Sequence, residues 1–354
     1  MSTAVNPESD QTSPSTSPPS SASARPGGRR SRLPKWAKLV VLAVLLVLLI
    51  SLPFWMSGYA VSIMSRALAF ALLVVSVDLL TGYTGLPTLG QVAYFGAGAY
   101  AAGLVGVHWT SNAFVQVIVG TLVAAVLALI TGVVAVRTKG FVFLMVTLAI
   151  TELAHQQAIA MDLIGGSNGL SIPPITVLPG GEPLVLAGFV YFWVLFVFVV
   201  GVILAVVLVN SPMGRSMRGI RDGEVRMRAI GRRTFVVKLV AYAFAGSLAG
   251  MAGTAWAASQ RFVSPGDMAF SLAAIALLAA VFGGAGTIWG PIVAAILVII
   301  IRDHVGPIAG GMGGTILGVV FVLAVFLLPK GIAGLAARRN RAATAGPVVA
   351  GEES

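Results

Sequence analysis

Long apolar runs are the feature that most constrains the fold of this chain. Eight stretches of about 20 residues carry few or no charged side chains, at 39–57, 61–80, 87–107, 114–136, 141–161, 189–209, 239–258 and 307–328. An α-helix of that length crosses the hydrocarbon core of a bilayer. The sequence is 57% hydrophobic and 10% charged, whereas a soluble domain has about 25% charged residues. We therefore predict an all-α, polytopic integral membrane protein.

Charge indicates how often the chain crosses the membrane. A ninth apolar stretch, 271–301, is too long for one simple span and is interrupted by "GGAGTIWGP" at 283–291. Basic segments of multi-pass proteins gather on the cytoplasmic side, which explains the net charge of +11 without a nucleic-acid partner. The basic loop 210–238 and the basic C-terminus both reach that side only if 271–301 crosses twice. We expect about ten crossings with both termini cytoplasmic, since nine would place the C-terminus outside.

The same pattern divides the chain into regions. Residues 1–38 are rich in Ser and Pro and offer nothing to bury, so we expect a disordered cytoplasmic tail. Residues 39–335 form the membrane domain, which includes the loop 210–238, and residues 336–354 form a second cytoplasmic tail. The loop 162–188 contains no Lys or Arg and is expected outside, either as a surface for a partner or as a lid.

Two apolar segments are interrupted by glycine and proline: "GYTGLPTLGQVAYFGAGAYAAG" (82–103) and "GGAGTIWGPIVAAI" (283–296). Short, interrupted helices of this kind mark the pathway in many transporters. Small residues also allow close helix packing, which we favour for the helical portions. The breaks themselves predict pathway elements, and the candidate residues are Gly85, Pro87, Thr88, Gly90, Gln91, Gly283, Gly284 and Gly286.

A polar group lies near the middle of the span 141–161. Glu152, His155 and Gln156 fall on one helical face, where polar side chains are costly unless they line a pathway or bond to another helix. These two explanations are equally consistent with the sequence. A Glu-x-x-His pair also occurs in di-iron bundles, but no second pair is present and we predict no metal site. Asp78, close to a cytoplasmic end, is expected to be a solvated interfacial acid.

Eight of the 23 Lys and Arg residues lie within 214–238. Membrane orientation accounts for the arginines, but not for the interleaved acids or for a terminal glycine. We therefore expect a short helix that docks a soluble partner through Gly214, Arg218, Arg221, Asp222, Glu224 and Gly231. No lysine is followed by Ser or Thr, so the chain has no phosphate-binding P-loop and is not itself an ATPase.

Six motifs in register now indicate a family. They are "TGYTGLPTLGQVAYFGAGAY" (81–100), "RTKGFVFLMVTLAITE" (137–152), "GGSNGL" (165–170), "RFVSPGDMAFSL" (261–272), "GGAGTIWGP" (283–291) and "LPKGIAGL" (328–335). Together with the segment from Gly214 to Trp256, they resemble the branched-chain amino acid ABC-transporter permeases of the LivM type. The resemblance covers about residues 60–335.

This resemblance implies an importer subunit of the bacterial cytoplasmic membrane that works by alternating access. A sister LivH-type permease, two cytoplasmic ATPases that hydrolyse the ATP, and an extracytoplasmic solute-binding protein would be its partners. The loop at 214–231 would be the coupling helix, and this chain would hold no cofactor. A urea or short-amide permease remains an alternative. An ion-coupled secondary transporter, with Glu152 and Asp78 carrying protons, is a second alternative.

The chain departs from the family's usual residues in two regions. Asp78 stands where the family usually has Asn, and Pro87-Thr88 stands where it has Leu-Ser. These differences leave the exact substrate open. Arg232-Arg233 replaces the usual Ile-Asn, and Arg226 and Arg228 add further charge. We expect the docking groove of the partner ATPase to be correspondingly acidic.

Overall fold

The computed structural model describes residues 47–53, 55–177, 184, 186–305 and 318. The two predicted tails, the predicted span 307–328 except for Gly318, and residues 39–46 and 54 of the span 39–57 lie outside these residues. The chain divides into Met1–Leu49 and Ile50–Ser354, and only the second unit is considered below.

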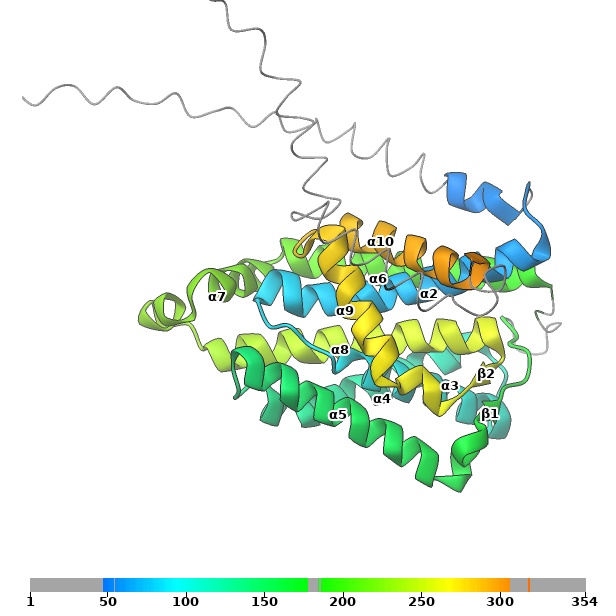
Figure 1. Ribbon diagram of the computed structural model, residues 1–354, viewed down its shortest axis with the longest axis horizontal. Helices are drawn as coiled ribbons and strands as arrows, with labels where there is room; N and C mark the ends of the chain where they lie inside the picture. The colour runs from blue at the N-terminus through cyan, green and yellow to red at the C-terminus, as the bar shows by residue number, and fades with distance from the viewer. Residues whose placement is uncertain (1–46, 54, 178–183, 185, 306–317, 319–354) are drawn as a thin grey trace, which may run out of the picture. The chain divides into compact units, whose positions relative to one another are not determined.

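Helices make up almost all of this unit (Figure 1). The long helices are α2 (Gly58–Asp78), α3 (Gln91–His108), α4 (Ala113–Ala135), α5 (Gly140–Ala160), α6 (Ala187–Asn210), α7 (Pro212–Ala229), α8 (Thr234–Gln260), α9 (Phe270–Gly284) and α10 (Trp289–Ile300). Short helical turns are η1 (Leu79–Thr84), η2 (Asp162–Ile164), η3 (Gly166–Asn168), η4 (Pro265–Met268) and η5 (Ile301–Val305). Two-residue strands, β1 (Leu170–Ser171) and β2 (Phe262–Val263), pair antiparallel.

The prediction of an all-α membrane protein is confirmed. Within the described residues, five helices are long and apolar enough to cross a bilayer: Gly58–Thr84, Ala113–Ala135, Gly140–Ala160, Ala187–Asn210 and Thr234–Gln260. The count of about ten crossings stays a prediction. Between α9 and α10 the helix is interrupted at 285–288, as the "GGAGTIWGP" motif led us to expect.

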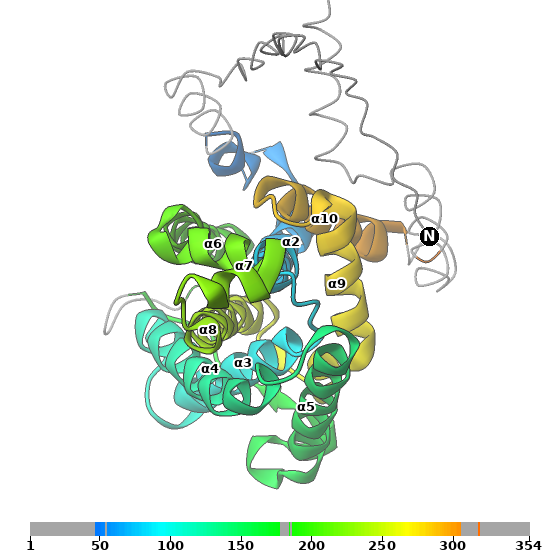
Figure 2. The same ribbon diagram turned by 90° about the vertical axis from the view of Figure 1, so that its left-hand side faces the viewer.

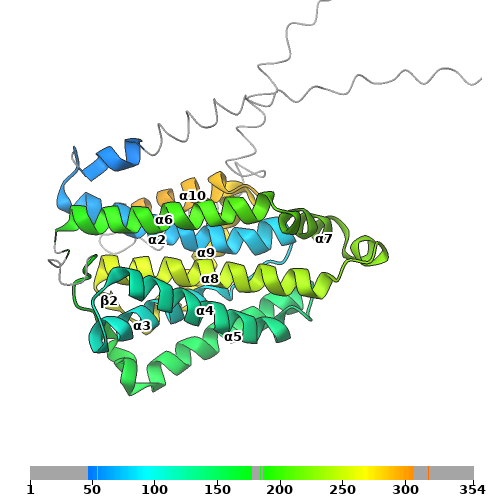
Figure 3. The same cartoon turned by 180° about the vertical axis from the view of Figure 1, so that it is seen from behind.

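Small residues bring α3, α4 and α8 together, and Figure 3 shows α4 lying along α8. The backbone of Gly98 on α3 lies against that of Gly250 on α8, and the other face of Gly250 meets Ala124 on α4. A side chain at Gly253 would collide with the carbonyl oxygen of Phe95. Close packing, the role expected for the helical glycines, is therefore confirmed.

The segment between α2 and α3 is not helical throughout. After α2 the chain forms the π-helical turn η1, and residues 85–90 then run without regular structure before α3 begins at Gln91. Two threonines of α5 hold this segment: Thr147 Oγ1 accepts from Leu89 N at 3.3 Å, and Thr151 Oγ1 donates to Leu89 O at 2.9 Å. The predicted span 87–107 is thus helical only from residue 91.

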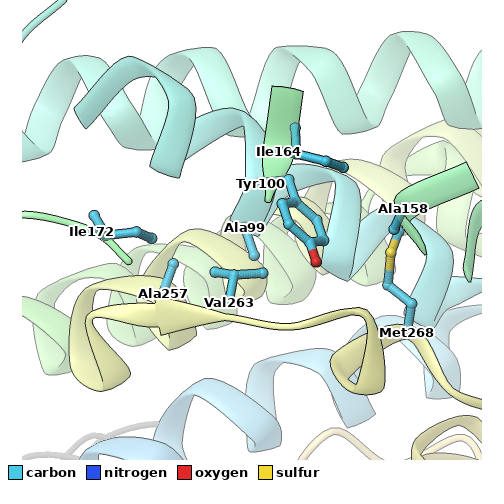
Figure 4. Close-up of a cluster of buried hydrophobic side chains, with 8 residues drawn as sticks. All are labelled: Ala99, Tyr100, Ala158, Ile164, Ile172, Ala257, Val263 and Met268. Carbon is cyan, nitrogen blue, oxygen red and sulfur yellow. The ribbon is translucent and has the colours of Figure 1, made fainter. Parts of the chain in front are cut away.

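An apolar cluster closes the end of the bundle where β1 and β2 lie (Figure 4). Its buried residues are Ala99, Tyr100, Ala158, Ile164, Ile172, Ala257, Val263 and Met268. They come from α3, α5, α8 and the connecting segments after α5 and α8. The connection 162–177 is therefore packed onto the helices as a cap.

Candidate functional site

Helix α7 is the most polar element described and lies at the end of the bundle opposite the cap (Figure 1), the end that faces the viewer in Figure 2. Ser211 caps it, since its Oγ accepts from the amides of Met213 at 3.1 Å and Gly214 at 3.3 Å. Gly223 interrupts the helical backbone with φ 170° and ψ 95°. After Ala229 the chain turns at Gly231, whose φ of 80° favours glycine. The expected helix ending at a glycine is confirmed, with a kink that the sequence did not predict.

The first part of α7 is tied to its surroundings by two arginines. The guanidinium of Arg218 donates to Val209 O at 2.9 Å and to Gly214 O at 3.3 Å, which fixes the corner between α6 and α7. Arg221 donates to the carbonyl oxygen of Gly82 in η1. Both arginines therefore bind carbonyl groups of this chain and fix the first part of α7 to the end of α6 and to η1.

The second part of α7 is held by an ionic network around Glu224. Lys238 Nζ lies 2.8 Å from Glu224 Oε1, Arg228 Nη2 lies 2.6 Å from the same oxygen, and Lys139 Nζ lies 3.5 Å from Glu224 Oε2. Burial alone would raise the pKa of Glu224, but hydrogen bonds from Lys238 and Arg228 and the nearby positive charges lower it to about 2. The network therefore stays charged at physiological pH and joins α7 to the starts of α5 and α8.

An exposed tip remains at 225–233. Val225 is 79% exposed and Ile230 is 72% exposed, although both are apolar. Three arginines surround them on the same segment and are themselves exposed: Arg226, Arg232 and Arg233. The sequence did not single out these two apolar residues, although a pair of aliphatic side chains inside a strongly basic segment is a signal of this kind of surface. Asp222 is exposed just before the kink.

The two glycine-rich breaks meet beside α7. Asp78 Oδ1 accepts from the amide of Gly286 at 2.7 Å, across 208 residues of sequence. A side chain at Gly82 would collide with Asp78 and with the backbone of Gly286, while Gly85 lies against Arg221. Asp78 is only 1% exposed. The expectation of a solvated interfacial acid is therefore wrong, because its partner comes from the distant 285–288 break.

The remaining glycines of the second break form its tight turn. A side chain at Gly283 would collide with the backbone of Gly290 and Pro291, so α9 and α10 approach closely here. Gly284 and Gly286 have φ values of 103° and 87°, which other residues rarely adopt.

Hydroxyl groups surround the first turn of α3. Gly90 N donates to Thr88 Oγ1 at 3.0 Å, and a side chain at Gly90 would touch the Tyr242 hydroxyl. The hydroxyls of Tyr94 and Tyr242 lie 2.9 Å apart. Gln91 is fully buried, and neither polar atom of its amide has a hydrogen-bond partner among the described residues. Pro87, by contrast, is half-buried.

The polar group of α5 lies on an outer face of this unit. The Glu152 side chain is 50% exposed; Gln156 Nε2 donates to Glu152 Oε1 at 2.9 Å, and His155 Nδ1 lies 3.6 Å from the same oxygen. Apolar residues of α5 share this exposure, with Phe141 at 70% and Leu153 at 68%. The structure therefore does not bring Glu152, His155 and Gln156 together with the helix breaks. Among the described residues, no group of three His, Asp or Glu side chains could hold a metal ion.

Comparison with known proteins identifies the family. The family model described as branched-chain amino acid transport system / permease component matches residues 59–328. The high-affinity branched-chain amino acid transport system permease protein LivM of Escherichia coli K12 is 29% identical over 285 residues, which cover 74% of this chain and 67% of the relative. Its counterpart from Salmonella typhimurium LT2 is 28% identical over 75% of this chain and 68% of the relative.

A more distant relative is the probable LivM permease of Methanocaldococcus jannaschii, 25% identical over 50% of this chain and 61% of the relative. No solved structure shows a significant match. The matching family consists of transport proteins rather than enzymes. The match extends from α2 to beyond η5 and includes α7 and both helix breaks. This multi-pass membrane protein therefore belongs to the family of branched-chain amino acid transport system permease components.

Proposed function

We propose that this chain forms one half of the transmembrane pathway of an ATP-driven importer for branched-chain amino acids, and that α7 is the helix by which one of the two cytoplasmic ATPases acts on it. The observation that carries this proposal is the tip at 225–233. It presents two exposed aliphatic side chains among exposed arginines, outside the five candidate spans. Apolar side chains ringed by charge are typical of a surface that a partner covers.

The proposed orientation places α7 and both termini in the cytoplasm. Basic residues favour that side, and α7 is the densest basic segment of the sequence. With α7 inside, the cap formed by 162–177 faces outside, where a solute-binding protein would deliver the substrate. Helices α9 and α10, of 15 and 12 residues, serve in this arrangement as two short half-spans, which supports a total of about ten crossings.

The proposed pathway lies between this chain and a sister permease, against α5. Glu152 and Gln156 are exposed on a mostly apolar helix, and an ionisable group in contact with lipid is costly. A second permease would cover this face and leave Glu152, His155 and Gln156 beside a hydrated passage. The helix breaks at 85–90 and 285–288 lie away from Glu152 and shape the passage indirectly.

The first test is assembly and transport. The tagged chain is purified in mild detergent with its neighbours, and the complex is reconstituted in liposomes with the binding protein outside and ATP inside. Uptake of labelled leucine that requires ATP, together with recovery of two P-loop ATPases and a second permease, is expected. Uptake driven by an ion gradient, with the chain purifying alone, would refute the proposal. ATP-dependent uptake of urea but not leucine would correct the substrate.

The second test addresses the tip. Arg228 is bound to Glu224, so reversing its charge would disturb the fold as well as the surface. We therefore choose Arg226→Glu with Arg232→Glu, and expect recovery of the ATPase to fall about tenfold if its groove is acidic. Arg215→Glu is the matched control, because Arg215 is an exposed arginine of α7 outside the tip. Equal recovery of the ATPase with the double variant and with the control would contradict docking at 225–233.

A further inference from the structure

Three segments that lie far apart in the sequence meet at one point. They are the end of α2 with η1, the middle of α7, and the 285–288 break. Arg221 of α7 donates to the carbonyl of Gly82, and Asp78 accepts from the amide of Gly286 at 2.7 Å. Each bond joins a side chain to a backbone group that lies outside a regular α-helix. The carbonyl of Gly82 lies in the π-helical turn η1, and the amide of Gly286 lies in the 285–288 break.

The backbone at this point leaves no room for independent movement. A side chain at Gly82 would collide with the amide of Gly286, and one at Gly286 would lie about 3 Å from Gly82 O and closer to the Arg221 guanidinium. Because packed groups at such distances cannot slide past one another, a shift of Arg221 displaces both breaks.

The kink at Gly223 gives α7 two separate attachments. Before the kink, Arg221 binds η1; after it, Glu224 binds Lys238 of α8. The exposed tip at 225–233 belongs to the second part. A partner that binds the tip therefore acts on a helix that is anchored to α8 on one side of the kink and to the helix breaks on the other.

We propose that Asp78 and Arg221 are positioning residues that form a clasp between α7 and the two helix breaks, and that the clasp transmits movement of α7 to residues 85–90 and 285–288. This inference rests on the proposed function, because it takes α7 to be moved by an ATPase. The clasp does not touch the substrate. Its role is to make the inner end of the passage follow the nucleotide state of the ATPase.

Because the sequence contains no cysteine, a single introduced thiol can report on the helix break directly. Thr287→Cys places a single thiol in the 285–288 break, at an exposed position. In the reconstituted complex, the rate of maleimide labelling of this thiol is compared with ATP and vanadate present and with nucleotide absent. We expect a change of at least about fivefold between the two states, the lower end of typical coupling between distant sites.

Asp78→Leu in this background removes the hydrogen bond to Gly286 and is expected to abolish the nucleotide dependence of labelling. It should also lower uptake per ATP hydrolysed by about tenfold. Asp78→Asn keeps an Oδ1 acceptor for the Gly286 amide, so both the labelling change and the uptake should be retained. If Asp78 acted only by supporting the fold, Asp78→Leu would lower recovery of the complex. In the complex that is recovered, the rate of labelling would still depend on nucleotide.

Arg221→Met tests the other half of the clasp and guards against misfolding of the Asp78→Leu variant, because Arg221 is exposed. It should likewise abolish the nucleotide dependence of labelling, whereas Arg215→Met on the same helix should leave it intact. If Asp78→Leu or Arg221→Met retains the full labelling change and full uptake, the clasp is refuted. Failure of the unmodified complex to show ATP-dependent uptake would refute the proposed function instead.

Discussion

Replacing Glu224 with glutamine tests whether the ionic network holds α7 in place. The substitution keeps the shape of the side chain and removes its charge. It leaves the Lys238 ammonium group, only 3% exposed, without the carboxylate that lies 2.8 Å away. A buried charge without a partner is unfavourable, so the free energy of unfolding should fall.

The expected size follows from the pKa of Glu224. Its fall from 4.5 to about 2 corresponds to about 3 kcal/mol of preference for the charged form in the folded state. Glu224 is 17% exposed, and its partners Lys139 and Arg228 are 58% and 55% exposed, so solvent screens part of this energy. We therefore expect Glu224→Gln to lower the free energy of unfolding by about 2 kcal/mol.

The assay is unfolding of the purified complex in mixed micelles with increasing SDS, followed by far-ultraviolet circular dichroism. Asp222→Asn is the matched control: it removes an exposed acid from the same helix, one that is in no ion pair among the described residues. The control should change the free energy by less than about 0.5 kcal/mol. A loss for Glu224→Gln no greater than that of the control would refute the reasoning.

Three further predictions use the same unfolding assay. Folding lowers the pKa of Glu224, so the stabilisation that its charge gives the folded state is complete above about pH 4.5 and disappears as the pH falls towards 2. The difference in free energy of unfolding between wild type and Glu224→Gln should therefore be constant from pH 7 to 5 and vanish near pH 2. Gly253→Ala brings a methyl group against the carbonyl of Phe95 and should lower the free energy of unfolding by about 1–3 kcal/mol. Gly188→Ala, with open space around it, should be nearly neutral, and equal effects of the two variants would contradict the described packing. Tyr94→Phe removes the hydroxyl that is hydrogen-bonded both to Tyr242 at 2.9 Å and to Thr131 at 2.5 Å, and should cost about 1–2 kcal/mol; a cost near zero would show that the two bonds together contribute nothing.

The helices were predictable where apolar length alone determines them. The predicted spans 114–136, 141–161 and 189–209 differ from α4, α5 and α6 by at most two residues at either end, because charged or turn-forming residues bound each run. The break between α9 and α10 was predictable for a similar reason, since its glycines adopt positive φ values.

Contacts between distant segments were not predictable. Asp78 was expected to be solvated because it lies near a span end, but its partner Gly286 is 208 residues away. For the same reason nothing in 214–238 distinguished arginines that bind this chain from arginines that face outwards. Gly82 O lies 139 residues from Arg221 in sequence, and only the fold brings the two together.

The apolar cluster at the capped end also bears on how the protein is made. Its members extend from Ala99 to Met268, and β1 finds its partner β2 only after α8 is complete. During synthesis the N-terminal helices emerge first. The chain from α2 to η4 must therefore be synthesised before this end can close, whereas the small-residue contacts among α3, α4 and α8 need only the chain up to Gln260.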